Sequence, residues 1–285
     1  MNKADLYMKN SIESVLENGY MDKNPRPKYK DGSPAYTLSV NHVVRTYDLS
    51  KEFPITTLRP IAWKTGIKEI FWIYQDQTSK LLPLKEKYNV HYWDEWQSKD
   101  KPGTIGQRYG ATVNRYDLIN KLIKDIERDP YGRRKVMSLW QENDLAETDG
   151  LAPCAFLTIW NVRNGRDKEY LDMCLIQRSG DMLSASGAGG INEVQYAALQ
   201  MMIAKHTGYE SGNFTHFVAN EQIYDRHKEQ AQEMLDRFDN TEDDGVNPRL
   251  ILNTDKKSFY EFTIDDFVME NYNPIKPQIK FELGI

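Results

Sequence analysis

Two strand-like runs joined by a short turn place the strongest constraint on the fold of this chain. Residues 156–162 and 170–178 flank the turn Asn164-Gly165-Arg166-Asp167, a pattern typical of a β-hairpin. If the runs pair, Arg178 lies beside Cys154. A guanidinium favours the thiolate, which is the nucleophilic form of cysteine. Most free cysteines are instead small buried hydrophobes, so the spacing alone leaves both interpretations open.

Composition narrows the class of protein. The 285 residues include 37 Lys and Arg against 42 Asp and Glu, and this net charge of −5 argues against a general nucleic-acid binder. Two cysteines in a chain of this length do not form a disulfide framework, and no apolar segment follows Met1. No run approaches the roughly 20 apolar residues of a membrane span. We therefore expect a cytoplasmic protein. The five histidines have no ligand spacing, and we expect no metal.

The remaining patterns mix helices and strands along one chain. Neither an internal repeat nor a linker divides it, so we predict a single domain over residues 1–285 with an α+β fold. Helices are expected at 4–17, 61–74, 118–126, 193–206 and 223–238. Strands are expected at 36–47, 135–140, 156–162, 170–178, 215–218, 258–268 and 278–283.

Several polar residues have both a structural and a functional interpretation. Glu69 lies in an apolar helical stretch, where burial would raise its pKa and suit proton handling. Arg133-Arg134 is an ordinary solvated pair unless an anion faces it, since two planar guanidiniums bind phosphate well. Asn192 is placed to cap the helix that follows it.

A set of separated motifs, in this order along the chain, resembles one family. The motifs are Trp93-Asp94-Glu95-Trp96, Arg133-Arg134, Pro153-Cys154, Gln177-Arg178-Ser179 followed by Asp181, and Tyr224. They resemble the folate-dependent thymidylate synthases with a cysteine nucleophile, from about Arg26 to Ile285. The resemblance implies one large mixed β-sheet covered by helices, and a homodimer packed through the sheets. It also implies reductive methylation of dUMP to dTMP, with 5,10-methylenetetrahydrofolate as the one-carbon and hydride donor and dihydrofolate as the second product.

The same resemblance implies catalytic roles for five residues. Cys154 would add to C6 of the uracil ring, because neutral uracil is a poor electrophile that needs a thiolate. Asn192 would read the pyrimidine, since its amide offers both an acceptor and donors. Glu69 and Tyr109 match residues associated with proton transfer through ordered water, and Asp181 matches an aspartate near the ring and the folate.

Further residues would bind the ligands. Trp93 and the carboxylate of Ile285 resemble folate-side groups, and Arg133 and Arg134 resemble a pair that reaches into the neighbouring subunit. The expected dUMP ligands are Arg26, Arg133, Arg134, Gln177, Arg178, Ser179, Asn192, Gln222 and Tyr224. No membrane or nucleic-acid partner is expected.

Four positions depart from the commonest pattern of that family. Ala155 follows the nucleophile where many members have histidine, and Gln222 replaces a histidine expected near the ribose. Leu58 stands where a lysine is common, which bears on a polyglutamate tail. The loop 184–190 is about three residues longer than usual. None of these removes the nucleophile or Asn192.

Three alternative functions remain open from the sequence. A dUMP hydroxymethylase of the same superfamily ends the one-carbon transfer with water, whereas its cytosine-specific branch has aspartate at the position of Asn192. The run Gly187-Ala188-Gly189-Gly190-Ile191-Asn192 lies between a strand and a helix, as a dinucleotide-binding loop does, but ends in Asn192 instead of glycine. A nucleotide-binding protein without catalysis would keep the arginines and need no reactive Cys154.

Overall fold

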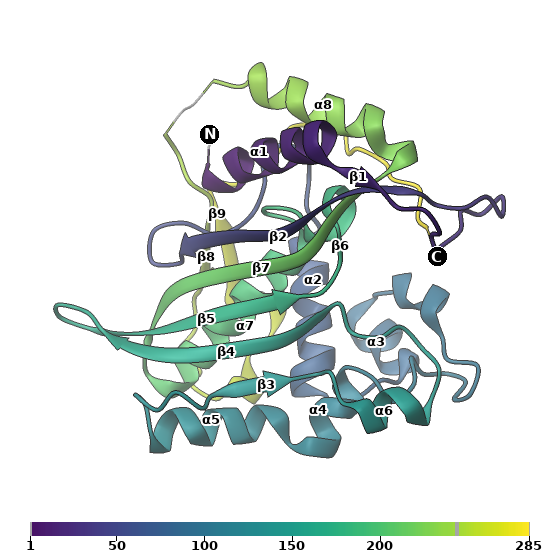
Figure 1. The fold of residues 1–285 in the computed structure, drawn as a ribbon. Helices are drawn as coiled ribbons and strands as arrows, with labels where there is room; N and C mark the ends of the chain where they lie inside the picture. Colours follow the sequence, from purple (N-terminus) through teal and green to yellow (C-terminus); the bar gives the residue numbers. More distant parts are fainter. Residues whose placement is uncertain (1, 243–244, 285) are drawn as a thin grey trace.

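A mixed β-sheet forms the centre of the computed structural model, which describes residues 2–242 and 245–284. Among these residues the sheet has seven strands in the order β1-β2-β7-β5-β4-β3, with β6 beside β7 (Figure 1). The predicted hairpin is confirmed, because β4 and β5 pair antiparallel from Ala155 opposite Gln177 to Asn164 opposite Glu169. Strand β5 runs parallel to β7, whereas β2 and β7 are antiparallel.

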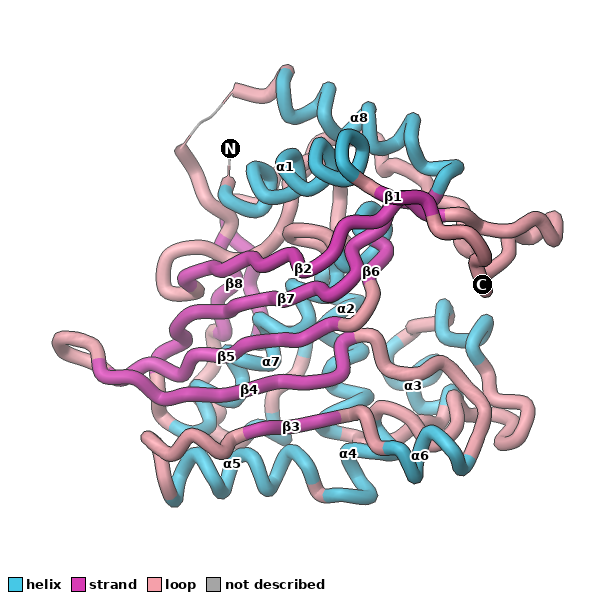
Figure 2. The backbone as a smooth tube through the Cα atoms, in the orientation of Figure 1, coloured by secondary structure: helices cyan, strands magenta, loops and turns pink. Residues whose placement is uncertain are grey.

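Figure 2 shows how the helices and strands alternate along the backbone. The strands are β1 (Tyr20–Met21), β2 (Thr37–Asp48), β3 (Val136–Ser138), β4 (Ala155–Asn164), β5 (Glu169–Gln177), β6 (Gly180–Asp181), β7 (Glu210–Tyr224), β8 (Arg249–Leu252) and β9 (Phe267–Glu270). The α-helices are α1 (Lys3–Asn18), α2 (Trp63–Ile70), α3 (Leu81–Tyr88), α4 (Gly110–Tyr116), α5 (Leu118–Arg128), α6 (Glu142–Glu147), α7 (Ile191–Thr207) and α8 (Lys228–Asp239).

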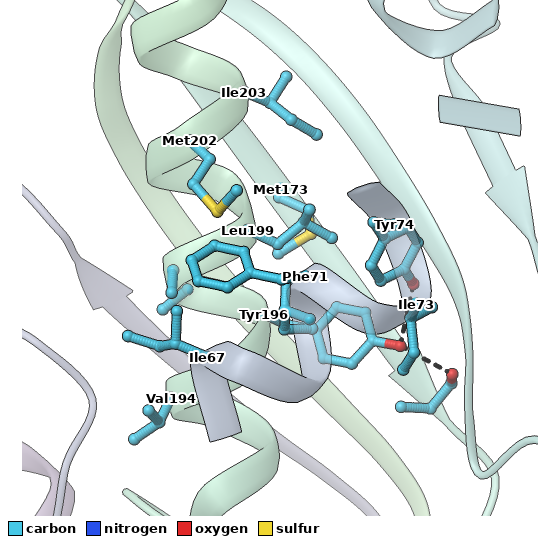
Figure 3. Packing of buried hydrophobic residues seen from close by; sticks show 14 of the residues in the cluster. Ile67, Phe71, Ile73, Tyr74, Met173, Val194, Tyr196, Leu199, Met202 and Ile203 are labelled. Carbon is cyan, nitrogen blue, oxygen red and sulfur yellow. Dashed lines mark hydrogen bonds between the residues drawn. The ribbon is translucent and has the colours of Figure 1, made fainter. Parts of the chain in front are cut away.

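One face of the sheet is buried against helices. Strand β5 alternates, with Leu171, Met173 and Leu175 buried and the residues between them only partly so, as the two-residue period of a strand requires. Helices α2 and α7 lie behind this face (Figure 1). Helix α7 is enclosed, and nearly all of its residues from Glu193 to Ala204 are buried. Its Tyr196 donates to the Ala155 carbonyl at 3.1 Å and lies 3.2 Å from the Tyr74 hydroxyl (Figure 3).

No helix of the described residues covers the opposite face of the sheet (Figure 1). Cross-strand registers align two rows of outward side chains. One row is Val44, Phe217, Ile176 and Leu157, and the other is Thr46, Thr215, Cys174, Ile159 and Val136. Both end members Val44 and Val136 are more than half exposed, at 55% and 54%. We call these nine residues the open face. It is largely apolar, which is unusual for a surface in water.

The prediction of an α+β fold with a large mixed sheet is confirmed, but some boundaries were wrong. Strand β7 is much longer than 215–218, and it includes residues 223 and 224, so α8 begins only at Lys228. Residues 258–266 form 3-10 turns at 259–261 and 264–266, because Phe259 and Phe262 are anchored in the core from irregular backbone.

No strand forms at 278–283 within the described residues. There the side chains of Gln230 and His227 contact the carbonyls of Lys280 at 3.4 Å and Glu282 at 2.8 Å. These side chains satisfy backbone groups that a strand partner would otherwise pair. Helices α3, α4 and α6 and strand β8 were not expected. That one domain spans residues 1–285 stays a prediction. No described helix has the length and apolarity needed to cross a bilayer.

Candidate active site

Cys154 lies at the end of the β4–β5 pair, beside Arg178 as the sequence predicts. Arg178 Nη2 donates to Cys154 Sγ at 3.5 Å and to the Ala152 carbonyl at 2.8 Å, and Nε donates to the Pro153 carbonyl at 2.9 Å. Its backbone N–H donates to the Cys154 carbonyl at 2.9 Å. The guanidinium therefore both holds the segment that carries the thiol and places positive charge beside the sulfur.

The electrostatics of Cys154 combine two opposing effects. Burial raises the pKa of the thiol, while the guanidiniums of Arg178 and Arg26 act to lower it. Burial has the larger effect, so the thiol stays mainly protonated without a ligand. A proton acceptor is therefore needed when the thiolate forms.

A buried acid on α2, Glu69, shares two tyrosine neighbours with this thiol, because both groups act on the pKa of Tyr109 and of Tyr196. Burial raises the pKa of Glu69 to about 7, and Trp93 and Gln195 act to lower it. The indole N–H of Trp93 lowers this pKa as a donor toward the Glu69 carboxyl, although Nε1 has no acceptor within 3.5 Å among the described residues. A carboxyl with a pKa near neutrality can hold or release a proton at physiological pH.

Tyr109 connects the thiol to that acid. Its hydroxyl accepts the Cys154 backbone N–H at 3.4 Å, and its ring lies 5.3 Å from that of Trp93. Burial raises the pKa of Tyr109 far above its usual value, and the nearby charges of Cys154 and Glu69 act in the same direction. The residue adopts a φ of 46°, a strained conformation for a non-glycine residue, which the packing around it maintains.

Asp181, Tyr224 and Arg26 converge on the same region. Burial raises the pKa of Asp181, against hydrogen bonds from Ser184 and the charges of His227 and Arg59. Burial raises the pKa of Tyr224 to about 12, and its charged neighbours include Asp181, Arg26 and Cys154. Arg26 itself is exposed and makes no hydrogen bond or ion pair among residues 2–242 and 245–284.

Asn192 lies in the first turn of α7 with its amide held on both sides. Gln177 Nε2 donates to Asn192 Oδ1 at 3.3 Å, and Asn192 Nδ2 donates to Gln195 Oε1 at 3.0 Å. The prediction that Asn192 caps this helix is wrong. Gly190 is the N-cap, and Asn192 is the second helical residue, so its side chain is free to face the site.

The other predicted residues are placed as follows. Ser179 accepts from Gln177 Nε2 through its carbonyl at 3.0 Å, and Gln222 on β7 pairs with Asp181 on β6. Ala155 and Leu58 are buried. Residues 182–186 of the long loop form a π-helical turn capped by Asp181. The predicted carboxylate of Ile285 lies outside the described residues.

Arg133 and Arg134 are not brought to Cys154 within one chain. Val136 pairs with Ile159, so the two arginines lie beyond that point, seven or eight residues along the sheet from Cys154. At about 3.3 Å per residue this is roughly 20 Å or more. Both are exposed, and neither makes a hydrogen bond or ion pair in the part of the chain that the structure describes.

Sequence reasoning missed Gln195 and a buried polar cluster behind Gln177. The cluster consists of Arg45, Glu193, His216 and Glu221, and each is at most 1% exposed. A usable signal existed, because the two-residue period of β2 places Arg45 on the same inward face as Tyr47. A charged residue on such a face requires buried partners.

A surface hollow of about 630 Å³ also exists, between Ser79, Lys80, Gln107 and Arg115. None of the predicted site residues lines it.

A thiol at a sheet end, a guanidinium, a buried acid and a fixed amide are the parts of an enzyme that acts through a cysteine nucleophile. The family model described as "Thymidylate synthase" matches residues 6–285. The chain belongs to the thymidylate synthase family, and it is an enzyme of the methyltransferase class.

Similar proteins cover the whole chain. It is 51% identical over 287 residues to a thymidylate synthase of Streptococcus pneumoniae (strain ATCC 700669 / Spain 23F-1), and 50% identical to one of Streptococcus sanguinis (strain SK36), with 100% of each chain covered in both cases. The solved structure of thermostable thymidylate synthase A from Bacillus subtilis has a TM-score of 0.86 at 33% identity, covering 99% of both chains. The predicted family, fold and activity are confirmed.

Proposed function

We propose that the chain converts dUMP to dTMP with Cys154 as the nucleophile that adds to C6 of uracil. The observation that carries this proposal is the position of the thiol, 3.5 Å from Arg178 Nη2 at the end of the β4–β5 pair. Arg178 stabilises negative charge on sulfur. Burial, which raises the pKa of the thiol, keeps it protonated until substrate arrives.

Phosphate binding uses guanidiniums that still have donors to offer. Arg178 donates through Nε and Nη2 to protein atoms, which leaves its Nη1 without a partner among the described residues. Arg26, close enough to affect the pKa of both Cys154 and Tyr224, adds a second cation. Ser179 lies next to Arg178 and contributes its hydroxyl, while Gln222 and Tyr224 border the sugar.

Base recognition belongs to Asn192. With Oδ1 and Nδ2 held in place by Gln177 and Gln195, the second lone pair and the second proton of the amide remain for a ligand. Uracil offers N3–H as a donor and O4 as an acceptor, which is the matching pattern. Negative charge that develops on O4 is thereby stabilised. Glu69, with a pKa near 7, and the Tyr109 hydroxyl handle protons on the same side of the site.

The reduced folate fits beside these groups. The Asp181 carboxyl, whose pKa is raised by burial, offers a polar group to a ligand, and the buried Trp93 ring near Glu69 offers an aromatic surface. We propose 5,10-methylenetetrahydrofolate as the co-substrate, held by Trp93, Asp181 and the carboxylate of Ile285. Bound folate supplies the one-carbon unit and the hydride. The chain itself binds and orients it and excludes water.

A homodimer completes the site. The open face is largely apolar and has no helix over it among the described residues. Arg133 and Arg134 precede its member Val136 and have no hydrogen-bond or ion-pair partner in the described part of the chain. Packing two open faces together would bury that surface and carry each arginine pair toward the partner's Cys154. We place the protein in the cytoplasm, with no metal or nucleic acid required.

The direct test is an assay with dUMP and methylenetetrahydrofolate, followed by the absorbance of dihydrofolate. Thymidylate synthesis forms dihydrofolate and dTMP in equal amounts. The alternative activity, dUMP hydroxymethylation, would form 5-hydroxymethyl-dUMP and no dihydrofolate. Product chromatography from the same reactions distinguishes the two.

A further inference from the structure

Asn192 belongs to a series of four side chains in which each one donates a hydrogen bond to the next. We call His216, Gln177, Asn192 and Gln195 the amide series. Its links are His216 Nε2 to Gln177 Oε1 at 3.1 Å, Gln177 Nε2 to Asn192 Oδ1 at 3.3 Å, and Asn192 Nδ2 to Gln195 Oε1 at 3.0 Å. Beyond it, the Gln195 amide lies close enough to Glu69 to lower the pKa of that carboxyl.

The direction of the series is determined by a backbone group. The Ser179 carbonyl can only accept, and it lies 3.0 Å from Gln177, so the nearer atom of that amide is the donor Nε2. The other end of Gln177 is then Oε1, which requires a proton on His216 Nε2. The second proton on Gln177 Nε2 is donated to Asn192, and this places Oδ1 of Asn192 toward Gln177 and Nδ2 toward Gln195.

His216 is anchored within the buried cluster. Its Nδ1 lies 3.0 Å from Glu193 Oε1 and 3.3 Å from Arg45 Nη2. Arg45 Nε donates to Glu193 at 2.7 Å and Nη1 donates to Glu221 at 2.7 Å, which holds the guanidinium in place. The His216 ring therefore cannot turn over without breaking its contacts with Arg45 on β2, Glu193 on α7 and Gln177 on β5.

The charges around His216 leave its role as a donor unchanged. Burial would raise the pKa of Glu193, but Arg45, His216 and the Gly189 N–H together lower it to about 2, so this carboxylate stays ionised. Burial lowers the pKa of His216, while Glu193 opposes the change. A neutral ring with its proton on Nε2 and a fully protonated ring both donate to Gln177.

We propose that His216, anchored by Glu193 and Arg45, holds the Oε1 end of Gln177 while the Ser179 carbonyl holds its Nε2 end. The amide series thereby keeps Asn192 in the orientation that selects uracil over cytosine. His216 is a positioning residue, because it acts through Gln177. The proposal rests on the proposed role of Asn192 as the base reader. Cytosine carries an acceptor at N3 and a donor at its amino group, so an Asn192 amide turned by 180° would match cytosine instead of uracil.

The test compares the dissociation constants of dUMP and dCMP by competition binding, as the ratio Kd(dCMP)/Kd(dUMP). His216→Phe keeps a flat ring and removes the donor. Gln195→Leu independently removes the acceptor that holds Asn192 Nδ2. Each should lower the ratio by about tenfold, mainly by weakening dUMP, because one end of the amide series no longer has a fixed partner. His216→Gln retains an N–H donor and should keep most of the ratio.

Phe214→Leu is the matched control, since Phe214 is equally buried on β7, two residues from His216. Its ring stacks on that of His216 with centroids 6.3 Å apart, so the variant changes the packing of His216 without removing a hydrogen bond of the amide series. It should lower the melting temperature and leave the ratio unchanged. An unchanged ratio in folded His216→Phe and Gln195→Leu overturns the proposal, as does an equal fall in Phe214→Leu. If His216→Phe does not fold, Gln195→Leu decides.

Asn192→Asp distinguishes the positioning role of His216 from the base-reading role of Asn192, on which it rests. A carboxylate lacks the donor pattern of the amide, so the ratio should fall sharply in this variant. If the ratio moves in Asn192→Asp but not in the His216 and Gln195 variants, only the positioning role fails. If Asn192→Asp leaves the ratio unchanged with its fold intact, the base-reading role itself is wrong.

Discussion

Cys154 and Cys174 occupy different surroundings on the same sheet. Cys154 has a guanidinium 3.5 Å away, whereas Cys174 lies on the open face and burial alone raises the pKa of its thiol. We expect Cys154→Ser to bind nucleotide and to lose at least about a thousandfold in kcat, because a hydroxyl is a far weaker nucleophile. Cys174→Ser should stay within about twofold of the parent.

Steady-state rates of both variants, with nucleotide binding measured separately, test this pair. A Cys154→Ser variant that retains substantial turnover would exclude the covalent mechanism. A large loss of activity in Cys174→Ser alone would identify Cys174 on β5, and not Cys154, as the nucleophile.

Glu69 makes the stability of the protein depend on pH. Its pKa rises from 4.5 to about 7 on folding, so between these pH values the folded state keeps a proton that the unfolded state has lost. Stability therefore falls as pH rises through this window and is unaffected by Glu69 below it. At about 1.4 kcal/mol per pH unit over roughly 2.5 units, the total is about 3 kcal/mol.

Glu69→Gln removes this titration. Urea unfolding from pH 4.5 to 8 should show the free energy of unfolding of the parent falling by about 3 kcal/mol relative to the variant. Parallel curves for the two proteins would mean that Glu69 has an ordinary pKa in the folded state and does not serve as the proton-handling group.

At the scale of elements, the start of α7 depends on Gly189. This residue has a φ of +65°, and an added Cβ would lie 2.2 Å from the Thr56 backbone nitrogen. Its N–H donates to Glu193 Oε2 at 2.7 Å, so the turn also positions the anchor of His216. Gly189→Ala should cost about 2–4 kcal/mol, since backbone strain and a clash with backbone atoms add together.

Gly208 at the other end of α7 offers a matched control. Its φ is +82°, and nothing lies within 4 Å of an added Cβ. Gly208→Ala should therefore cost only about 1 kcal/mol, from the left-handed conformation alone. Chemical denaturation of both variants tests the difference, and equal losses would show that the clash at Gly189 is relieved by movement of the loop.

Sequence patterns predicted elements where period and burial agree. The alternation in residues 170–178 identifies the inward side of β5, and the hairpin turn determines which residues meet Cys154. The pattern failed where apolar residues serve irregular backbone, as at Phe259 and Phe262. It also failed at Asn192, because the helix begins at Ile191, two residues earlier than a cap at Asn192 would place it.

The sequence allowed us to predict which residues form the candidate site but not the hydrogen bonds between them. Motif order identified Cys154, Arg178, Gln177 and Asn192 as members of one site. Nothing in the spacing joins His216 to Gln177, since they are 39 residues apart and meet only through the parallel register of β5 and β7. Long-range contacts of this kind are set by tertiary packing, which local periodicity does not encode.

For the whole molecule, the proposed dimer predicts complementation between defective chains. Arg133→Ala and Cys154→Ser should each be nearly inactive. After subunit exchange, a hybrid would have one site with an intact thiol from one chain and an intact Arg133 from the other. Random mixing should restore about a quarter of the parental sites. Mass spectrometry verifies the exchange, and verified hybrids without activity would show that Arg133 does not act across subunits.

If the proposed dimer forms through the open face, the activity per chain depends on the protein concentration. If each active site needs two copies, a newly made chain is folded but inactive until it binds a second one. When the chains are mostly monomeric, the total activity then grows with the square of the chain concentration. Dilution should then lower the activity per chain, while a nucleotide whose phosphate is held by both copies should favour association by mass action. Supply of its own substrate would thus help to assemble the enzyme that consumes it.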